Sequence, residues 1–216
     1  MASLPCELTV LYVDEALLVL EKPADLLCVP GKGEDKQDCL SRRVQQRYAD
    51  ALVVHRLDMA TSGLLVMARG ASAQRALNDA FASRKVHKRY VAVVDGLLEP
   101  ATDDWGAIDL PILPDWPNRP RRIIDPQGKP SITCWRVLSQ NLAEHTTRVE
   151  LEPVTGRSHQ LRVHLQALQH PILGDALYGT PTSLAKADRL LLHATRLELT
   201  HPVSLQAMVF SSDPPF

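Results

Sequence analysis

Short apolar runs separated by turn residues follow one another along the chain and predict more strands than helices. We expect strands over residues 8–13, 16–21, 52–54, 63–68, 89–94, 132–138, 147–152, 190–199 and 205–210. In the run at 147–152, charged residues alternate with Val149 and Leu151. This alternation predicts a strand with one buried face and one face in solvent.

Helical periodicity is confined to three segments, at 38–48, 72–82 and 159–168. Asp38 and Ser158 stand where the first and third helices would begin, and both residue types accept hydrogen bonds from the first turn of a helix. Hairpin strands combined with three helices predict an α+β fold, built on a mixed, mostly antiparallel sheet with flanking helices.

Residues from about 97 to 130 interrupt this pattern, since they are rich in proline, aspartate, glycine and arginine. The prolines within 110–117 exclude a central strand there. We therefore expect a loop insertion at about 97–130, a kind of segment that often carries function. The chain otherwise fits a single domain over residues 1–216.

Composition is typical of a globular enzyme, with 45% hydrophobic and 23% charged residues. No run approaches the roughly 18 apolar residues of a membrane helix, and the first residues lack the basic and apolar segments of a signal peptide. Cys6, Cys28, Cys39 and Cys134 are irregularly spaced, so we expect reduced thiols, no metal site and a cytoplasmic protein.

The net charge of −1 hides an uneven distribution of charged residues. Basic residues cluster at 83–90 and 118–122, whereas acidic residues gather at 34–35 and 103–104. Binding to phosphates requires local clusters rather than a global excess of positive charge. The two basic runs are therefore either nucleic-acid-binding surfaces or solvated faces without a partner.

The tetrad His55-Arg56-Leu57-Asp58 lies between apolar runs, and Thr61-Ser62-Gly63 is the expected turn after it. Charged groups set between core strands are costly to desolvate unless they are paired. The spacing alone leaves two interpretations open, an Arg56–Asp58 pair that braces a turn or a functional site.

A second dense group of polar residues spans 155–164, where the third helix would begin. His159 and His164 are five residues apart and so lie on different faces of a helix, which argues against a metal site. The chain has no phosphate-binding glycine loop and no nucleophile elbow. Asp58 is thus a carboxylate without a second one in a recognisable motif, which favours covalent or general-base chemistry at a sugar or base.

Five motifs in consistent order between residues 8 and 210 resemble those of the RluA-type pseudouridine synthases. They are His55-Arg56-Leu57-Asp58 with Thr61-Ser62-Gly63-Leu64, Lys88-Arg89-Tyr90-Val91-Ala92, residues 156–164, residues 170–175 with Tyr178-Gly179, and residues 191–194 with His201-Pro202. Residues 109–111, 115–120 and 128–130 are similar to the compact dual-specificity branch of that family. Members of this branch modify a uridine in a 23S rRNA hairpin loop and one in the tRNA anticodon stem-loop.

The resemblance implies the pseudouridine synthase catalytic fold with a central active-site cleft, without an S4-like RNA-binding domain. It also implies RNA as the partner and a reaction without cofactor or metal, in which uracil leaves C1′ of its ribose, rotates and rejoins through C5. Asp25 and Gln169 depart from the usual family pattern, and both stand in expected turns. These departures concern local backbone geometry rather than chemistry.

By the same resemblance, Asp58 would be the catalytic carboxylate, Arg162 its ion-pair partner and Tyr90 the aromatic ring against the uracil. Arg56 would fill the gap that the flipped nucleotide leaves. Further RNA contacts are expected from His55, Thr61, Arg89, Arg119, Arg157, His159 and Gln160. For His55 a structural hydrogen bond is the alternative, because nothing in the reaction requires this side chain.

Two other functions stay open at this stage, a catalytically silent RNA-binding module on the same fold and a hydrolase of nucleosides or glycosides. The combination of Asp58, Tyr90 and Arg162 favours an active synthase over the silent module. The hydrolase is disfavoured because no recognisable motif supplies a second carboxylate. We expect a monomer that does not bind membranes.

Overall fold

A computed structural model of the chain describes residues 8–216 and divides them into two compact units. The first unit contains the residues up to Val86 together with Leu197–Ser212, and the second contains His87–Arg196 and Asp213–Phe216. Cys6 lies outside the described residues. A single catalytic domain with a central cleft remains a prediction.

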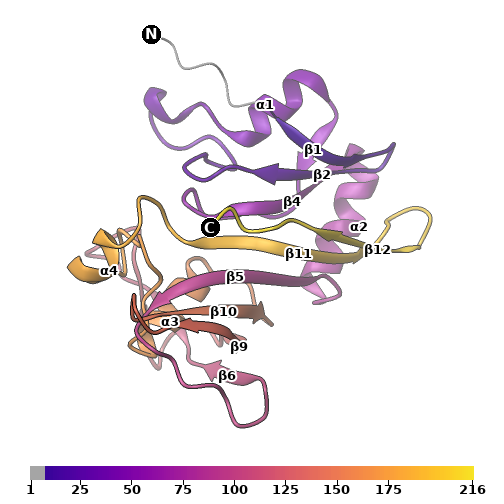
Figure 1. Cartoon of the computed structure of the whole chain (residues 1–216). Helices are drawn as coiled ribbons and strands as arrows, with labels where there is room; N and C mark the ends of the chain where they lie inside the picture. The colour runs from indigo at the N-terminus through magenta and orange to yellow at the C-terminus, as the bar shows by residue number, and fades with distance from the viewer. Residues whose placement is uncertain (1–7) are drawn as a thin grey trace. The chain divides into compact units, whose positions relative to one another are not determined.

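The first unit is built on antiparallel strands. β1 (Thr9–Val13) pairs with β2 (Leu17–Lys22), and β2 pairs in turn with β4 (Ser62–Arg69), so that these three strands lie side by side (Figure 1). β3 (Ala51–Val53) pairs with the end of β4, and β12 (Ala207–Ser211) pairs with β11 (Leu192–Thr200), a strand divided between the units. All but the last residue of β4 are buried, as expected of a central strand with an unbroken apolar run.

Helices of the first unit cover β3 and β4. α2 (Gly70–Ala82) packs against both strands, and α1 (Leu40–Arg47) packs against β3 after a short 3₁₀ turn at Glu34–Lys36. The prediction that Asp38 caps α1 is wrong, because Cys39 occupies that position and the Asp38 carboxylate pairs with Arg43 instead.

The turn expected at residues 61–63 lies earlier in the chain. A hydrogen bond from the Thr61 amide to the Asp58 carbonyl closes the turn, and Ser62 already belongs to β4. The apolar pattern located the strand correctly but not its first residues, because Ser62 and Gly63 are buried in the sheet despite being typical turn residues.

The second unit also has an antiparallel sheet. β5 (His87–Asp95) pairs with β10 (Thr146–Pro153), β10 pairs with β9 (Ile132–Asn141), and β9 pairs with β6 (Gly106–Asp109). Val149 and Leu151 of β10 are fully buried, while the charged residues between them are partly exposed. This confirms the alternation predicted for residues 147–152.

The segment expected as an insertion contains three short strands. β6 joins the sheet at its edge next to β9, and β7 (Ile112–Pro114) forms a separate two-stranded hairpin with β8 (Arg122–Ile124). The predicted insertion thus contains short strands that the sequence did not predict, and β7 lies outside the large sheet, as the exclusion of a central strand at 110–117 predicted. β7 tolerates Pro114 because this residue is the last of the strand, and Pro111 precedes the strand.

α3 (Gln160–Ala167) and the five-residue α4 (Pro181–Ala185) complete the second unit. His159, in the left-handed conformation with φ of 58°, precedes α3, so the prediction of Ser158 as its cap is wrong. α4 is too short to show a periodic pattern, which explains why the sequence did not predict it.

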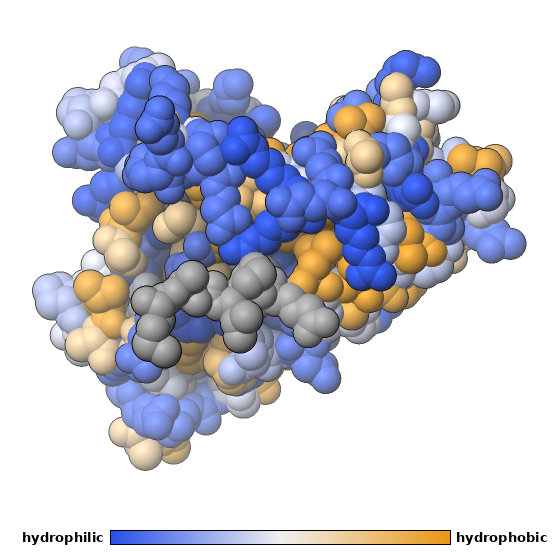
Figure 2. All heavy atoms as spheres, turned by 90° about the horizontal axis from the view of Figure 1, so that it is seen from above, coloured by the Kyte–Doolittle hydropathy of each residue, from blue (hydrophilic) through white to orange (hydrophobic). Residues whose placement is uncertain are grey.

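All nine predicted strands are present within three residues of their predicted ends, and the α+β class is confirmed. The face drawn in Figure 2 is mostly hydrophilic, with smaller hydrophobic areas between. Among residues 8–216, no helix is long and apolar enough to cross a membrane.

Candidate active site

Asp58 lies in the connection between β3 and β4 of the first unit, where the carboxylate is half-buried. Leu57 before it is buried, and Met59 after it is 49% exposed. The backbone turns sharply here, since the Thr61 amide donates to the Asp58 carbonyl oxygen at 3.1 Å. Thr61 itself is buried, so its part in the site is to shape this turn.

Lys22, the last residue of β2, holds the residue after Asp58. Its side chain is completely buried, and its ammonium group donates to the carbonyl oxygens of Pro23 at 2.7 Å, Leu26 at 2.9 Å and Met59 at 2.9 Å. Three acceptors match the three donors of an ammonium group, which offsets the cost of burying its charge. Lys22 thereby ties residues 23–26 to the Asp58 turn.

Cys28 holds the residue before Asp58. Its sulfur accepts from the Leu57 amide at 3.3 Å and donates to the Leu57 carbonyl at 3.2 Å. Burial raises the pKa of the Cys28 thiol, with the Asp58 charge adding to the effect and Lys22 opposing it. The sulfur therefore keeps the proton that it donates to the Leu57 carbonyl.

The other two polar residues of the tetrad, His55 and Arg56, have different surroundings. His55 Nε2 accepts a hydrogen bond from the Val66 amide at 3.1 Å, and the ring stacks on Phe81 with centroids 4.6 Å apart. These contacts give His55 the structural role named as its alternative. Arg56, in contrast, is exposed, as a residue that enters RNA must be.

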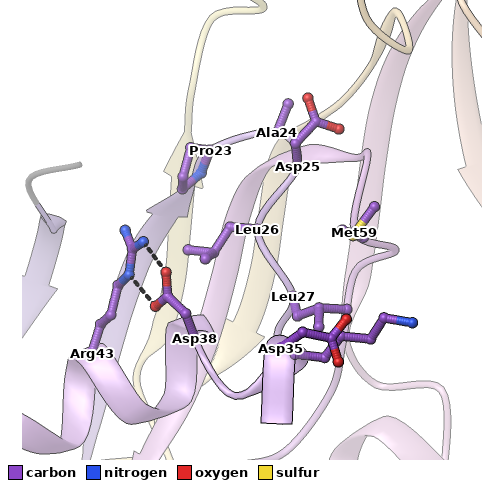
Figure 3. Close-up of a pocket in the computed structure, with 10 residues that line it drawn as sticks. Pro23, Ala24, Asp25, Leu26, Leu27, Asp35, Asp38, Arg43 and Met59 are labelled. Carbon is purple, nitrogen blue, oxygen red and sulfur yellow. Dashed lines mark hydrogen bonds and ion pairs between the residues drawn. The ribbon is translucent and has the colours of Figure 1, made fainter. Parts of the chain in front are cut away.

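An open pocket of about 390 Å³ lies beside the Asp58 turn within the first unit (Figure 3). Its lining includes Met59 and the carboxylates of Asp25, Asp35 and Asp38, the last paired with Arg43 as the dashed lines in Figure 3 mark. Lys36 and Arg43 also line the pocket, so three carboxylates stand against two cations and there is no excess of positive charge to attract phosphate groups. The pocket therefore gives no support for RNA binding at this point.

Arg162 is the centre of the polar cluster in the second unit. Its Nε and Nη2 donate to the two carboxylate oxygens of Asp175 at 2.8 and 2.6 Å, and the two side chains are 6% and 0% exposed. Asp175 also accepts from the backbone amides of Leu177 and Tyr178. A β-carbon at Gly174, where φ is 70°, would collide with the Arg189 carbonyl, so only glycine before Asp175 lets the Arg189 backbone come this close.

Tyr178 extends the cluster from Arg162 to the β7–β8 hairpin. Its hydroxyl lies 2.7 Å from His159 Nδ1 and accepts from the Arg122 amide at 2.8 Å, while the Arg162 guanidinium carbon lies 5.1 Å from its ring centroid. The Tyr178 side chain thus contacts His159 at the start of α3, the buried Arg162 and Arg122 of the β7–β8 hairpin.

Gln160 is buried and its amide group is used within the protein. Its carbonyl oxygen accepts from the Thr155 hydroxyl and the Arg157 amide, and its nitrogen donates to the Ile132 carbonyl and Thr133 hydroxyl. These four bonds fix the first turn of α3 on β9. Gln160 therefore has a structural role in the second unit, in place of the predicted contact with RNA.

The remaining residues of the predicted site occupy different surroundings in the second unit. Tyr90 is buried in β5, and the Arg89 guanidinium lies 3.3 Å from Glu152 and 3.7 Å from Glu150. Arg119 covers the ring of Trp116, and Arg157 is exposed near the Pro130 carbonyl. The two carboxylates beside Arg89 reduce its value for binding phosphate.

The predicted site residues are thus divided between the units. His55, Arg56, Asp58 and Thr61 belong to the first, and Tyr90, Arg162 and the others belong to the second. The described carboxylate partner of Arg162 is Asp175, and the predicted Asp58–Arg162 pair stays a prediction. Among residues 8–216, no group of three or more His, Cys, Asp or Glu side chains is arranged to hold a metal ion.

Comparison with known proteins decides the family. The model of the family described as RNA pseudouridylate synthase matches residues 16–167, which include Asp58, Tyr90 and Arg162. The chain belongs to this family. The expectation drawn from the five sequence motifs is confirmed.

Relatives of RluA type are similar to the chain over nearly their whole length. The dual-specificity RNA pseudouridine synthase RluA of Escherichia coli O6:H1 is 48% identical over 97% of this chain and 94% of its own length. The protein of the same name from Yersinia pestis is 46% identical over 96% of this chain and 99% of its own. A solved structure, human RNA pseudouridylate synthase domain containing 1, has a TM-score of 0.78 and 30% identity over 97% of this chain and 84% of that one.

Sequence reasoning missed three residues, Lys22 next to the Asp58 turn of the first unit and Asp175 and Tyr178 next to Arg162 in the second. The sequence signal for Lys22 is a lysine that closes an apolar strand just before a proline. Asp175 and Tyr178 stood inside matched motifs without an assigned role. Their part becomes evident only from the hydrogen bonds to Arg162 and His159.

Proposed function

We propose that this protein is an RNA pseudouridine synthase that isomerises uridines in stem-loops of 23S rRNA and of the tRNA anticodon arm. The observation that carries the proposal is the family match across the Asp58, Tyr90 and Arg162 motifs. The dual specificity rests on relatives that bear this description and cover nearly the whole chain.

In this reaction the bond between uracil N1 and ribose C1′ breaks and a bond between C5 and C1′ forms. C5 loses its proton and N1 takes one up, so the product is an isomer of the substrate. No atom is added from water, and no oxidation takes place. Asp58 acts by attacking C1′, by attacking C6 of the base or by removing a sugar proton, and each of these routes begins from an ionised carboxylate. A cation beside Asp58 keeps a half-buried carboxylate in that form.

Arg162 is the cation that we assign to this task. Its pair with Asp175 uses Nε and Nη2, two of the positions that carry the five N–H donors of a guanidinium group. We therefore assign to Asp175 the orientation of Arg162 and to Arg162 the charge that stabilises ionised Asp58. Tyr90 packs on the uracil in this proposal.

Arg56 takes the place of the flipped uridine in the RNA. Its exposure and its position two residues before Asp58 support this role, because the emptied stack and the flipped base lie close together. Flipping costs least in a hairpin loop, where the base is already partly unstacked. This preference agrees with stem-loop substrates.

The test is release of tritium from C5-labelled uridine in a tRNA anticodon stem-loop and in rRNA hairpins. We expect release by the wild-type protein and none by Asp58→Asn, with RNA binding retained in the variant. Asp79→Asn, a change at an exposed carboxylate of α2, is the matched control and should release tritium like wild type. If wild type binds these RNAs without any release, the silent RNA-binding module replaces the synthase.

A further inference from the structure

We propose that Trp116, at the turn of the β7–β8 hairpin, is a stacking platform for an unpaired base of the substrate RNA. This inference rests on the proposed function, because it takes RNA as the ligand. It adds a specificity-determining contact outside the residues that the reaction requires.

Arg119 packs against the ring of Trp116, and the ring lies at the surface of the protein. The Arg119 guanidinium carbon lies 3.4 Å from the ring centroid, so the guanidinium covers one face of the indole. Trp116 is nevertheless 64% exposed, whereas Trp135 is 9% exposed. An aromatic ring backed by a guanidinium and open to solvent is suited to stacking on a nucleobase.

The turn that carries Trp116 is held in shape by hydrogen bonds. The Asp115 amide donates to the Arg121 carbonyl at 3.1 Å, and the Arg121 amide donates to the Asn118 carbonyl at 3.0 Å. The Asn118 side chain donates to both carboxylate oxygens of Asp115 at 3.2 and 3.0 Å. A fixed turn loses little conformational entropy when its ring stacks on a ligand.

Local charge favours RNA over a protein surface as the partner. Residues 115–122 carry three arginines, at 119, 121 and 122, against the single carboxylate of Asp115. The turn therefore has an excess of two positive charges, which can attract phosphates. Bases next to a basic backbone-binding surface are the usual ligands of exposed aromatic rings in single-stranded RNA recognition.

The hairpin is joined rigidly to the Arg162 cluster. Ile112 of β7 packs in one buried cluster with Val163 of α3 and Tyr178, and the Arg122 amide donates to the Tyr178 hydroxyl. Trp116 therefore stands at a fixed distance from Arg162, which the proposed function places next to the target uridine. This arrangement allows the platform to select RNA loops with an unpaired base at the matching distance.

Binding of an anticodon stem-loop by the Asp58→Asn protein, with and without a second substitution, tests the proposal without turnover. Trp116→Ala should weaken binding about 10-fold, and Trp116→Phe should recover most of the loss. The slope of log Kd against log salt concentration should stay unchanged in Trp116→Ala and fall by about one in Arg119→Ala. Leu142→Ala, at an exposed residue of the β9–β10 turn, is the matched control and should bind normally.

A series of stem-loops, each lacking a different base of the loop, identifies the base that stacks on Trp116. For one of these RNAs the effect of Trp116→Ala should disappear, because ring and base are then both absent. Quenching of tryptophan fluorescence on binding should be present in the parent and largely lost in Trp116→Phe. Equal affinity of the Trp116→Ala and Leu142→Ala proteins would overturn the platform while leaving tritium release by wild type, and thus the proposed function, intact.

Discussion

The ammonium group of Lys22 lies 2.9 Å from the carbonyl oxygen of Met59, so a completely buried lysine holds the residue that follows Asp58. On the other side of Asp58, the Cys28 thiol exchanges two hydrogen bonds with Leu57. The candidate catalytic carboxylate is thus fixed through its backbone neighbours. Lysine is among the residue types least often buried, and the three carbonyl contacts help to hold its ammonium group in this position.

Lys22→Met should therefore impair both stability and activity. The substitution keeps most of the side-chain volume but leaves three carbonyl oxygens without their donor, and we expect a loss of about 3 kcal/mol in the free energy of unfolding. Displacement of the Asp58 turn should lower kcat for tritium release by about 10- to 100-fold. Urea unfolding and single-turnover kinetics measure the two effects. Lys32→Met, at an exposed lysine, is the control, and a normal kcat in folded Lys22→Met protein would contradict the positioning role.

Cys28 offers a milder test of the same turn. Cys28→Val removes donor and acceptor at similar volume, so the Leu57 peptide group loses two partners and stability should fall by roughly 2 kcal/mol. Cys28→Ser keeps both functions and should recover much of the rate. Cys134→Val in the second unit should leave kcat unchanged. Equal rates for Cys28→Val and Cys28→Ser would show that the hydrogen bonds to Leu57 do not matter for catalysis.

Asp175→Asn should be among the more damaging single changes in the second unit. It leaves the buried Arg162 guanidinium without its bidentate carboxylate, and removal of one partner from a buried ion pair costs about 3–5 kcal/mol. Asp95→Asn breaks the partly exposed pair with Lys186 and should cost about 1 kcal/mol or less. Chemical denaturation of both variants gives the comparison. Similar losses in the free energy of unfolding of the two variants would contradict the larger cost expected for breaking the buried Arg162–Asp175 pair.

Stability should fall in acid because of His193. Burial lowers the pKa of this histidine to about 4. The charge of Arg189 also lowers the pKa, to a smaller extent, and the charge of Asp213 raises it. The unfolded chain binds a proton near pH 6.5, so the contribution of neutral His193 is complete above that pH. It declines as pH falls towards 4, by about 3 kcal/mol in total. Urea unfolding between pH 7 and 4 should show a shallower decline in His193→Gln than in wild type or in the exposed control His87→Gln.

Most of the strands followed from the apolar pattern because each buries a nearly unbroken or alternating run. The unbroken run of β4 and the alternation of Val149 and Leu151 in β10 are examples. The hairpin of β7 and β8 was missed because each strand is three residues long and is flanked by prolines. A short strand has too few positions for a period to be recognised.

The sequence by itself determined the order of nine strands and three helices, the α+β class, the family and the residues that carry its motifs. All of these depend on the order and type of side chains along the chain. Only the tertiary structure decided that Lys22 and Cys28 hold the Asp58 turn, that Asp175 holds Arg162, and that Gln160 has a structural role. These contacts join residues from 13 to 37 positions apart, and no local pattern specifies which distant donor will meet which acceptor.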